Sequence, residues 1–400
     1  MILLFWNLNN KMKVFDCVVI GGGMVGAATA LSLSQLGLDV ALVENHPPKS
    51  IQENDKFDLR VSAISIASQK YLEQLGAWQH VQLNRACVYK RLGVRENQAA
   101  YTEFNADQIN QTHLGHILEN RMLQLALWQQ LTIENRVNIY CPEKLVSYSQ
   151  KQDYVEVELS EHSFKTKLLI GSDGAHSQVR QLANIGLTGW DYQQSAMLIN
   201  VETETPQQDI TWQQFFESGP IAMLPMRGHH ASLVWYNSKS EIKRLSKLDN
   251  DALLKEVERT FPRKLGKVNV VDKASFPLTR RHANQYVKNR VILVGDAAHT
   301  INPMAGQGVN LGFKDVKALQ LVIGEAIGAG QSWHQPEVLA NYETKRRKDN
   351  LLMMSAMDAL YVGFSNPSPV VKVFRNVGLF AANNIPFLKN KALEYACGIN

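Results

Sequence analysis

A run without a charged residue, from Cys17 to Leu38, constrains this chain more than any other feature. The run is long enough to span a bilayer as a helix, and Gly22 with Gly26 forms the GxxxG spacing of membrane helix pairs. A β-branched stretch, three glycines and then Ala, Leu and Ser at helical spacing indicate instead a strand, a turn and a helix. Ser32 and Ser34 lower the hydrophobicity, and no basic flank marks an inside end. We therefore predict strand, turn and helix.

The turn has the spacing of a dinucleotide-binding loop, Gly21-Gly22-Gly23-Met24-Val25-Gly26. Gly21 allows the tight turn, Gly23 lets the backbone approach a pyrophosphate, and Gly26 lets the helix pack on the strand. The helix N-terminus offers N–H groups to phosphates. A second strand, Asp39–Val43, leads into Glu44, whose carboxylate can accept hydrogen bonds from an adenosine ribose and favours FAD or NAD over NADP. The alternative is a glycine turn before a core helix.

A second glycine-rich segment follows the apolar run Val291–Val294. Asp296 lies at the carboxyl end of that predicted strand, where it can hold a sugar-like hydroxyl chain. Pro303 can lie against a flat ring, and Gly306 and Gly308 bring N–H groups near a ligand that gains negative charge, as a reduced isoalloxazine does. The alternative is a loop whose buried Asp caps a helix. The segment reads Gly295-Asp296-Ala297-Ala298-His299, then Pro303-Met304-Ala305-Gly306-Gln307-Gly308-Val309-Asn310.

A third segment, Gly171-Ser172-Asp173-Gly174-Ala175-His176-Ser177 with Arg180, follows the apolar run Leu168–Ile170. Taken alone, it predicts only a β-turn before a helix. Short apolar strands of this kind suit a parallel sheet covered on both faces.

These three segments are spread over the chain, so we predict one Rossmann-type α/β domain assembled from distant parts. Its boundaries are 14–185 and 285–335. Alternating strands over 186–284 predict an inserted antiparallel-sheet domain for the substrate, to which part of 76–110 could contribute. The region 336–400 is predicted to be helical.

Together, the three motifs resemble the FAD-dependent aromatic hydroxylases with the p-hydroxybenzoate hydroxylase fold. The resemblance spans residues 14–315 and implies that the motif residues, Asp173 included, bind FAD. It also implies that Arg60, in Asp58-Leu59-Arg60-Val61-Ser62-Ala63, and Arg121, in Glu119-Asn120-Arg121-Met122-Leu123-Gln124, reach the FAD. The residues alone would indicate solvated helix-end charges at both positions.

The resemblance is closer to the ubiquinone-biosynthesis hydroxylases of this family. It is carried by Asp58–Ser65, Glu119–Gln129, Leu169–Gly186, Trp212–Phe215, Ala231–Tyr236, Phe276–Val287, Gly295–Val316 and Met357–Asn366.

That branch implies hydroxylation of a polyprenylated methoxy-methyl-benzoquinol. In the family's chemistry, NADPH or NADH binds transiently and reduces FAD, and O₂ forms a C4a-hydroperoxide that transfers oxygen to the ring. No catalytic base is assigned. The alternatives are another flavoprotein hydroxylase or isoprenoid oxidoreductase of this fold, or a non-catalytic FAD-binding scaffold of the biosynthetic complex.

The hydroperoxide decays unless water is excluded. We expect the apolar runs Ile221–Leu224 and Ser232–Tyr236, with Trp212, Phe215, Phe216 and Trp235, either to form that dry wall or simply to fill a sheet core.

Composition excludes several other classes of protein. The 42 Lys and Arg against 37 Asp and Glu give a net charge of +5, and the basic residues are scattered, so no nucleic-acid partner is predicted. Four cysteines without a CxxC pair favour the reducing cytoplasm. His113, His116 and Glu119 lack a fourth ligand, so we predict no metal site. The first residues lack a basic n-region, so no targeting signal is predicted.

Three remaining features are ambiguous. Arg280-Arg281-His282 reads as an exposed basic turn or as a contact for NADPH phosphates, and Lys345-Arg346-Arg347-Lys348 as a solvated helix face. The helical pattern over Val370–Ala381 predicts a core-docking helix or, with a polyprenyl substrate, peripheral contact with the inner membrane. Other ubiquinone-biosynthesis enzymes are further candidate partners.

Overall fold

The computed structural model describes residues 12–52, 54–96, 101–301, 308–365 and 386–399. Within them, the charge-free run is a strand, a turn and a helix, as predicted: β1 spans Lys13–Ile20 and α1 spans Met24–Ser34. The side chains of Cys17, Val18 and Val19 are completely buried, because β1 lies inside a sheet that helices cover.

The first sheet has eight strands, in the order β17-β18-β11-β1-β2-β8, with β10 paired to β11 and β9 to β10. Its centre is parallel, since β1 pairs in parallel with β2 and β11, β2 with β8, and β11 with β18. This arrangement confirms the predicted α/β class. The remaining strands are β2 (Val40–Val43), β8 (Val137–Tyr140), β9 (Leu145–Gln150), β10 (Val155–Leu159), β11 (Ser163–Gly171), β17 (Val287–Lys288) and β18 (Val291–Leu293).

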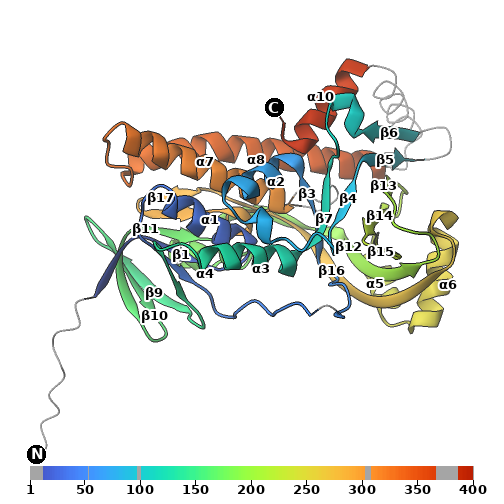
Figure 1. The fold of residues 1–400 in the computed structure, drawn as a ribbon, viewed down its shortest axis with the longest axis horizontal. Helices are drawn as coiled ribbons and strands as arrows, with labels where there is room; N and C mark the ends of the chain where they lie inside the picture. Colours follow the sequence, from blue (N-terminus) through green and yellow to red (C-terminus); the bar gives the residue numbers. More distant parts are fainter. Residues whose placement is uncertain (1–11, 53, 97–100, 302–307, 366–385, 400) are drawn as a thin grey trace, which may run out of the picture.

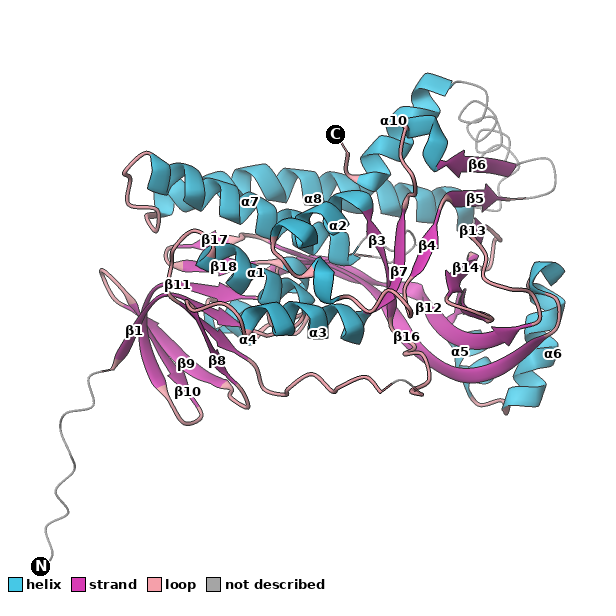
Figure 2. Ribbon diagram, in the orientation of Figure 1, coloured by secondary structure: helices cyan, strands magenta, loops and turns pink. Residues whose placement is uncertain are grey.

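Helices from distant parts of the chain pack on this sheet and on one another (Figure 1). α1 contacts both α3 and α7, and α7 runs beside α8. The bounds are α2 (Ile66–Gln74), α3 (Asn120–Leu131), α4 (Gln178–Leu182), α7 (Gly308–Gly328), α8 (Pro336–Ser365) and α10 (Pro386–Cys397). A three-stranded sheet in the order β3-β7-β4 lies between the two larger sheets (Figure 2), formed by β3 (Val61–Ser65), β7 (Gly115–Glu119) and β4 (Cys87–Tyr89).

The second large sheet has the order β19-β16-β12-β15-β14-β13-β5-β6. Its long strands β12 and β16 pair antiparallel, while β5 pairs in parallel with β13. The segment 76–110 therefore supplies two strands to this sheet. The bounds are β5 (Arg91–Arg95), β6 (Tyr101–Asn105), β12 (Leu187–Thr203), β13 (Ile210–Gln214), β14 (Ile221–Met226), β15 (His230–Ser238), β16 (Val268–Ala283) and β19 (His299–Thr300).

The second sheet buries side chains on both faces. α5 (Lys239–Ser246) and α6 (Asn250–Thr260) cover its outer face (Figure 2), where Trp212 and Trp235 pack near Phe261. We call the opposite side the inner face. It carries Ala196, Leu198, Phe215, Val234, Tyr236 and Leu278, and Tyr361 of α8 packs against it.

The predicted aromatic wall is therefore divided between the two faces. Trp212 and Trp235 pack in the outer core, as the sheet-core alternative expects, and only Phe215 of the four aromatic residues lies in the buried inner cluster. Phe216 is exposed. The physical reason is the two-residue period of a strand, which sends neighbouring side chains to opposite faces.

Candidate cofactor site

The first and third glycine segments pack directly on one another. A Cβ added to Gly21, which has φ +101°, would lie 2.5 Å from the Ser172 carbonyl oxygen. One added to Gly26 would lie 1.8 Å from the Gly21 oxygen and 2.3 Å from Ser172 Oγ. The Ser172 hydroxyl donates to the carbonyl oxygens of Ile20 and Gly21, at 2.9 and 2.8 Å. The third segment, predicted only as a turn, therefore holds the dinucleotide-type loop in place.

The second glycine segment contacts the first one through the side chain of Val25. Gly295 has φ +59°, and a Cβ there would meet Val25 Cγ1 at 3.1 Å. A Cβ at Gly312, one turn into α7, would lie 2.5 Å from Val25 Cγ2. All three segments thus converge at the amino ends of α1 and α7. The Val25 side chain packs between them, and contact of Val25 with the nucleotide stays a prediction.

The amino end of α1 is open. Gly23 is its N-cap, no side chain caps the helix, and a Cβ on Gly23 would meet nothing within 4 Å. A Cβ on Gly308, where α7 begins, would likewise meet nothing within 4 Å among the described residues. Helix N-termini attract anions through their N–H groups and dipole, so this geometry suits a pyrophosphate at α1.

Glu44 lies at the end of β2 and binds the glycine loop. Its Oε2 accepts from the Gly22 N–H at 2.5 Å, and its Oε1 accepts from the His46 N–H at 3.0 Å. A carboxylate has about four lone-pair sites, so acceptor capacity remains for a ribose. On the other side of the loop, the Gly22 carbonyl oxygen accepts from Gln124 Nε2 and Trp128 Nε1, at 2.8 and 2.7 Å.

The sequence reasoning missed Gln124 and Trp128. Their i, i+4 spacing in α3 places both on one helix face, but an isolated pattern of that kind is more typical of a packed helix. Only the α1–α3 contact shows that this face meets the loop.

Asp296 lies in the short helical turn Gly295–Ala297, just after β18. Its side chain is exposed, yet desolvation by the surrounding protein raises the pKa of its carboxyl group, an effect that His299 and Arg60 partly oppose.

Asp173 has one unused acceptor. Its Oδ2 caps α4 by accepting from the N–H groups of Gln178 and Val179, at 2.6 and 3.1 Å. Its Oδ1 is buried and finds no hydrogen-bond partner among the described residues. A buried acceptor without a partner is costly, so a ligand hydroxyl or N–H would stabilise it.

Arg121 begins α3 but is already paired. Its guanidinium makes two hydrogen bonds of 2.9 Å to the Asp58 carboxylate and one of 3.1 Å to the Ser50 carbonyl oxygen. Direct contact with FAD through Arg121 thus stays a prediction.

Asn310 makes contacts within the protein. Its Oδ1 accepts from the Ser65 N–H and the Ser68 hydroxyl, and its Nδ2 donates to the Ala63 oxygen. Its side chain ties α7 to β3 and α2, while Val309 packs against the core. Pro303, Gly306 and Gln307 lie outside the described residues.

A buried polar network supports the second glycine segment, and the sequence reasoning missed it. Asp315 of α7 is completely buried and accepts from the Gly295 N–H at 3.0 Å, His299 Nε2 at 2.5 Å, Arg346 Nε at 2.8 Å and Asn350 Nδ2 at 3.0 Å. Burial alone would raise the pKa of Asp315, but His299 and Arg346 outweigh it and hold the pKa well below its usual value.

This network corrects the prediction for Lys345–Lys348. Lys345 and Lys348 are exposed, but Arg346 is buried against Asp315. Successive side chains of a helix point in different directions, so one residue of a charged run can face the core while its neighbours face solvent.

The prediction for Arg280-Arg281-His282 as an exposed turn was also wrong. All three residues lie in β16, where Arg280 is 7% exposed and pairs with Asp358 of α8 at 2.9 Å. Its guanidinium also lies over the Trp190 ring, 4.4 Å from the centroid.

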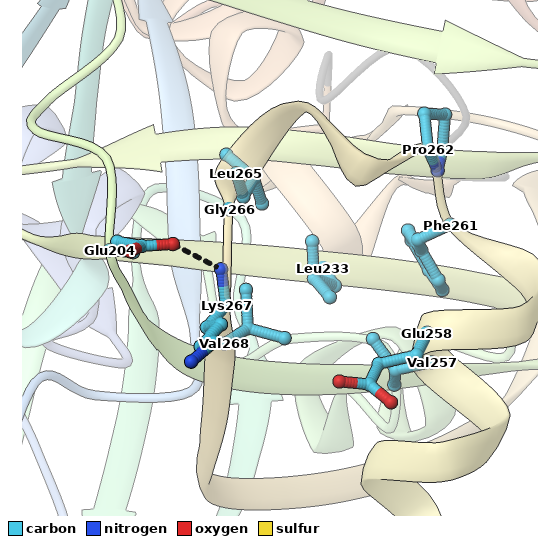
Figure 3. Close-up of a pocket in the computed structure, with 10 residues that line it drawn as sticks. All are labelled: Glu204, Leu233, Val257, Glu258, Phe261, Pro262, Leu265, Gly266, Lys267 and Val268. Atoms are coloured by element: carbon cyan, nitrogen blue, oxygen red, sulfur yellow. Dashed lines mark hydrogen bonds between the residues drawn. The ribbon is translucent and has the colours of Figure 1, made fainter.

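A separate cavity of about 400 Å³ lies against α6, on the outer side of the second sheet. Figure 3 shows Leu233 and Phe261 in its wall and the hydrogen bond from the Lys267 N–H to Glu204 at its edge. None of its lining residues belongs to the three glycine segments.

Among the described residues, no group of His, Cys, Asp and Glu is arranged to hold a metal ion. No helix in the described part of the chain is both long and apolar enough to cross a bilayer.

Residues 14–355 match the family model described as an FAD binding domain, and the chain belongs to this family. It is an FAD-dependent monooxygenase, which confirms the predicted class of enzyme.

The 3-demethoxyubiquinol 3-hydroxylase of Escherichia coli (strain K12) is 45% identical over 385 residues, covering 96% of this chain and 98% of the relative. The mitochondrial ubiquinone biosynthesis monooxygenase COQ6 of Homo sapiens is 31% identical, covering 98% and 94%. These relationships confirm the resemblance to the ubiquinone-biosynthesis branch. A solved p-nitrophenol 4-monooxygenase from Pseudomonas putida DLL-E4 shares the fold, with a TM-score of 0.78 at 21% identity, covering 96% of this chain and 97% of that one.

Replacing Glu44 by Ala should weaken FAD binding by about 1.5–3 kcal/mol, the scale of a hydrogen bond to a charged group. The Gly22 N–H loses its acceptor in the same step. Titration of flavin-free protein with FAD, followed by flavin fluorescence, measures the effect. Glu44→Gln keeps one acceptor oxygen and should lose less. An unchanged dissociation constant in Glu44→Ala would exclude this position for the ribose.

Proposed function

We propose that FAD lies across the meeting point of the three glycine segments. Glu44 would hold the ribose, the amino end of α1 the pyrophosphate, and Asp296 with Asp173 the hydroxyl and polar groups that follow. The isoalloxazine would lie at the start of α7. The observation that carries this proposal is the convergence of three segments, separated by more than a hundred residues, at the uncapped amino end of α1.

The bound flavin would supply the oxidation chemistry, and the chain would supply binding and a dry surface. We propose that the substrate is a polyprenylated methoxy-methyl-benzoquinol whose ring lies on the inner face of the second sheet. The names of the two relatives, a demethoxyubiquinol hydroxylase and a ubiquinone biosynthesis monooxygenase, support this class of substrate. Val234, Tyr236 and Leu278 make the inner face apolar, which would keep water from the reacting ring.

The reductant is proposed to be NADPH or NADH that binds transiently. The chain has a single GxGxxG segment, and we assign that segment to FAD. O₂ would be the second co-substrate, and other ubiquinone-biosynthesis enzymes would be the protein partners.

Steady-state oxidation of NADPH and NADH tests this function. The native protein should carry a flavin spectrum, and a short-chain demethoxyubiquinol should accelerate NAD(P)H oxidation with formation of the hydroxylated product. Flavin binding without any quinol-dependent oxidation would favour the scaffold alternative. Faster oxidation of an unrelated phenol would indicate another hydroxylase of this fold.

We further propose that the protein acts in the cytoplasm at the surface of the inner membrane, through its C-terminal helices. The predicted tail helix over Val370–Ala381 lies outside the described residues. The neighbouring helices expose Leu351, Leu352 and Val362 on α8 and Phe387 on α10, and Lys345 and Lys348 of α8 are exposed as well. Apolar and basic side chains together suit an anionic bilayer.

Flotation with vesicles containing anionic lipid should recover the native protein in the lipid fraction. The double variant Leu352→Glu, Phe387→Glu should reduce the bound fraction at least about tenfold, because burial of each side chain is worth roughly 1.5–3 kcal/mol. Ile133→Glu, an equally exposed apolar position at the end of α3, is the control. Equal flotation of all three proteins would exclude this surface.

A further inference from the structure

Asn200 connects the second sheet to the segment that carries Arg60. It lies in β12 and is only 4% exposed. Its strand neighbours Met197, Ile199 and Val201 belong to the outer core, so alternation places Asn200 on the inner face with Leu198. A buried amide is costly unless it forms hydrogen bonds.

The amide nitrogen of Asn200 holds two consecutive residues of a distant segment. Its Nδ2 donates to the carbonyl oxygens of Phe57 and Asp58, each at 3.1 Å. Its Oδ1 is buried and has no hydrogen-bond partner among the described residues. The side chain thus contributes to this structure through its two N–H groups.

Asp58 is the point where this contact reaches the proposed cofactor site. Its carbonyl is held by Asn200, its N–H donates to Glu119 Oε1 at 2.8 Å, and its carboxylate makes the paired 2.9 Å bonds to Arg121. Glu119 is itself fixed by Arg85 at 2.8 Å. Arg60 follows two residues after Asp58 in the same segment.

The segment borders a cavity. Phe57 and Lys56 line this cavity of about 390 Å³, together with Asn200 and Arg85. The Phe57 ring contacts the Arg85 guanidinium, 4.5 Å from the ring centroid, and the His230 ring at 4.9 Å between centroids. Directional hydrogen bonds therefore fix the backbone where the cavity leaves room for movement.

We propose that Asn200 is a positioning residue that aligns Arg60 and Arg121 with the flavin by fixing the backbone of Phe57 and Asp58 to the substrate-side sheet. The inference rests on the proposed placement of FAD. It links the surface that would hold the quinol to the two arginines through one amide group. Displacement of β12 would then alter the cofactor site directly.

The experiment compares Asn200→Leu, which keeps the number of side-chain heavy atoms and removes both N–H donors, with Ser232→Ala as the matched control. Ser232 lies directly opposite Asn200 in β15, is completely buried and has a hydroxyl without a partner among the described residues. Amide hydrogen exchange of residues 54–62, read by mass spectrometry in flavin-free protein, reports on the segment without any cofactor. FAD titration and the urea midpoint of unfolding are measured on the same samples.

In Asn200→Leu, exchange over 54–62 should accelerate at least about tenfold, and the FAD dissociation constant should rise about 5- to 50-fold, as expected for two lost neutral hydrogen bonds. Ser232→Ala should change neither quantity. A merely structural role would lower the urea midpoint and accelerate exchange throughout the sheet, without selecting this segment.

Unchanged exchange over 54–62 in Asn200→Leu would overturn the proposal, as would local acceleration with unchanged FAD affinity. Should the Leu variant fail to fold, Asn200→Ser, which is smaller and polar, takes its place with the same expected results. If native protein binds no FAD, the proposed site itself fails, while the exchange result still reports on Asn200.

Discussion

Asp296→Ala should yield a protein that purifies without flavin. The Asp296 side chain is exposed, yet desolvation by the surrounding protein raises the pKa of its carboxyl group, so a hydrogen bond to a flavin hydroxyl would be strong because water competes poorly. Each lost charge-assisted bond costs about 1.5–3 kcal/mol, or about 10- to 150-fold in affinity. The absorbance of the purified protein at flavin wavelengths, followed by FAD titration, measures this loss.

Asp296→Asn retains an acceptor oxygen and should bind FAD with intermediate affinity. Asp39→Asn, which changes a carboxylate near the start of β2 away from the loops, is the control and should stay yellow. An Asp296→Ala protein with its full flavin content would refute the role of this carboxylate.

The second large effect is expected from Asp315→Ala, which removes the shared partner of two buried basic groups. Arg346 and His299 would remain in the interior without their acceptor, and breaking a buried pair of this kind costs about 3–5 kcal/mol. The Gly295 N–H would lose its acceptor too, so FAD affinity should fall along with stability. Urea unfolding of the flavin-free protein measures the first change and FAD titration the second.

Two further variants separate charge from packing. Asp349→Ala removes a partly exposed partner of Arg346 and should cost less than about 1 kcal/mol. The double variant Asp315→Asn, Arg346→Met removes both charges and should recover much of the lost stability. Equal stability of Asp315→Ala and the native protein would contradict the pairing.

Acid should weaken the native protein partly through Asp315. Its pKa in the folded protein lies below the unfolded value of about 3.9, so its stabilising contribution is complete above that value and is lost as pH falls toward the folded pKa. The urea midpoint of native protein should thus drop more steeply below about pH 4 than that of Asp315→Ala. Parallel curves would show that this carboxylate has no depressed pKa.

The glycine loops were predictable from the sequence because the need for glycine arises at single positions within each loop. Gly21, Gly26 and Gly295 stand where a Cβ would collide with a neighbour, so the need for glycine shows in the sequence itself. The strand, turn and helix were predictable for the same reason, since periodicity and glycine spacing are properties of one short segment.

Contacts between distant segments were not predictable in this way. Arg346 occurs in a run of four basic residues, and nothing local indicates that it alone faces Asp315. Trp212 and Trp235 could have faced either side, because a sheet buried on both faces has no polar side to reveal its orientation. Asn200 gave no signal, since its partners are backbone carbonyls far away in the chain.

Helix α8 joins the two halves of the enzyme. Through Arg346 it holds the network beneath Gly295, and through Asp358 it holds Arg280 of the second sheet and the Tyr192 hydroxyl. The two positions are about 18 Å apart along one helix at 1.5 Å per residue. Because a helix of this kind resists stretching, it sets the spacing between the second glycine segment and the strands β12 and β16. Helix α8 thereby fixes the distance between the two sites that its Arg346 and Asp358 contact.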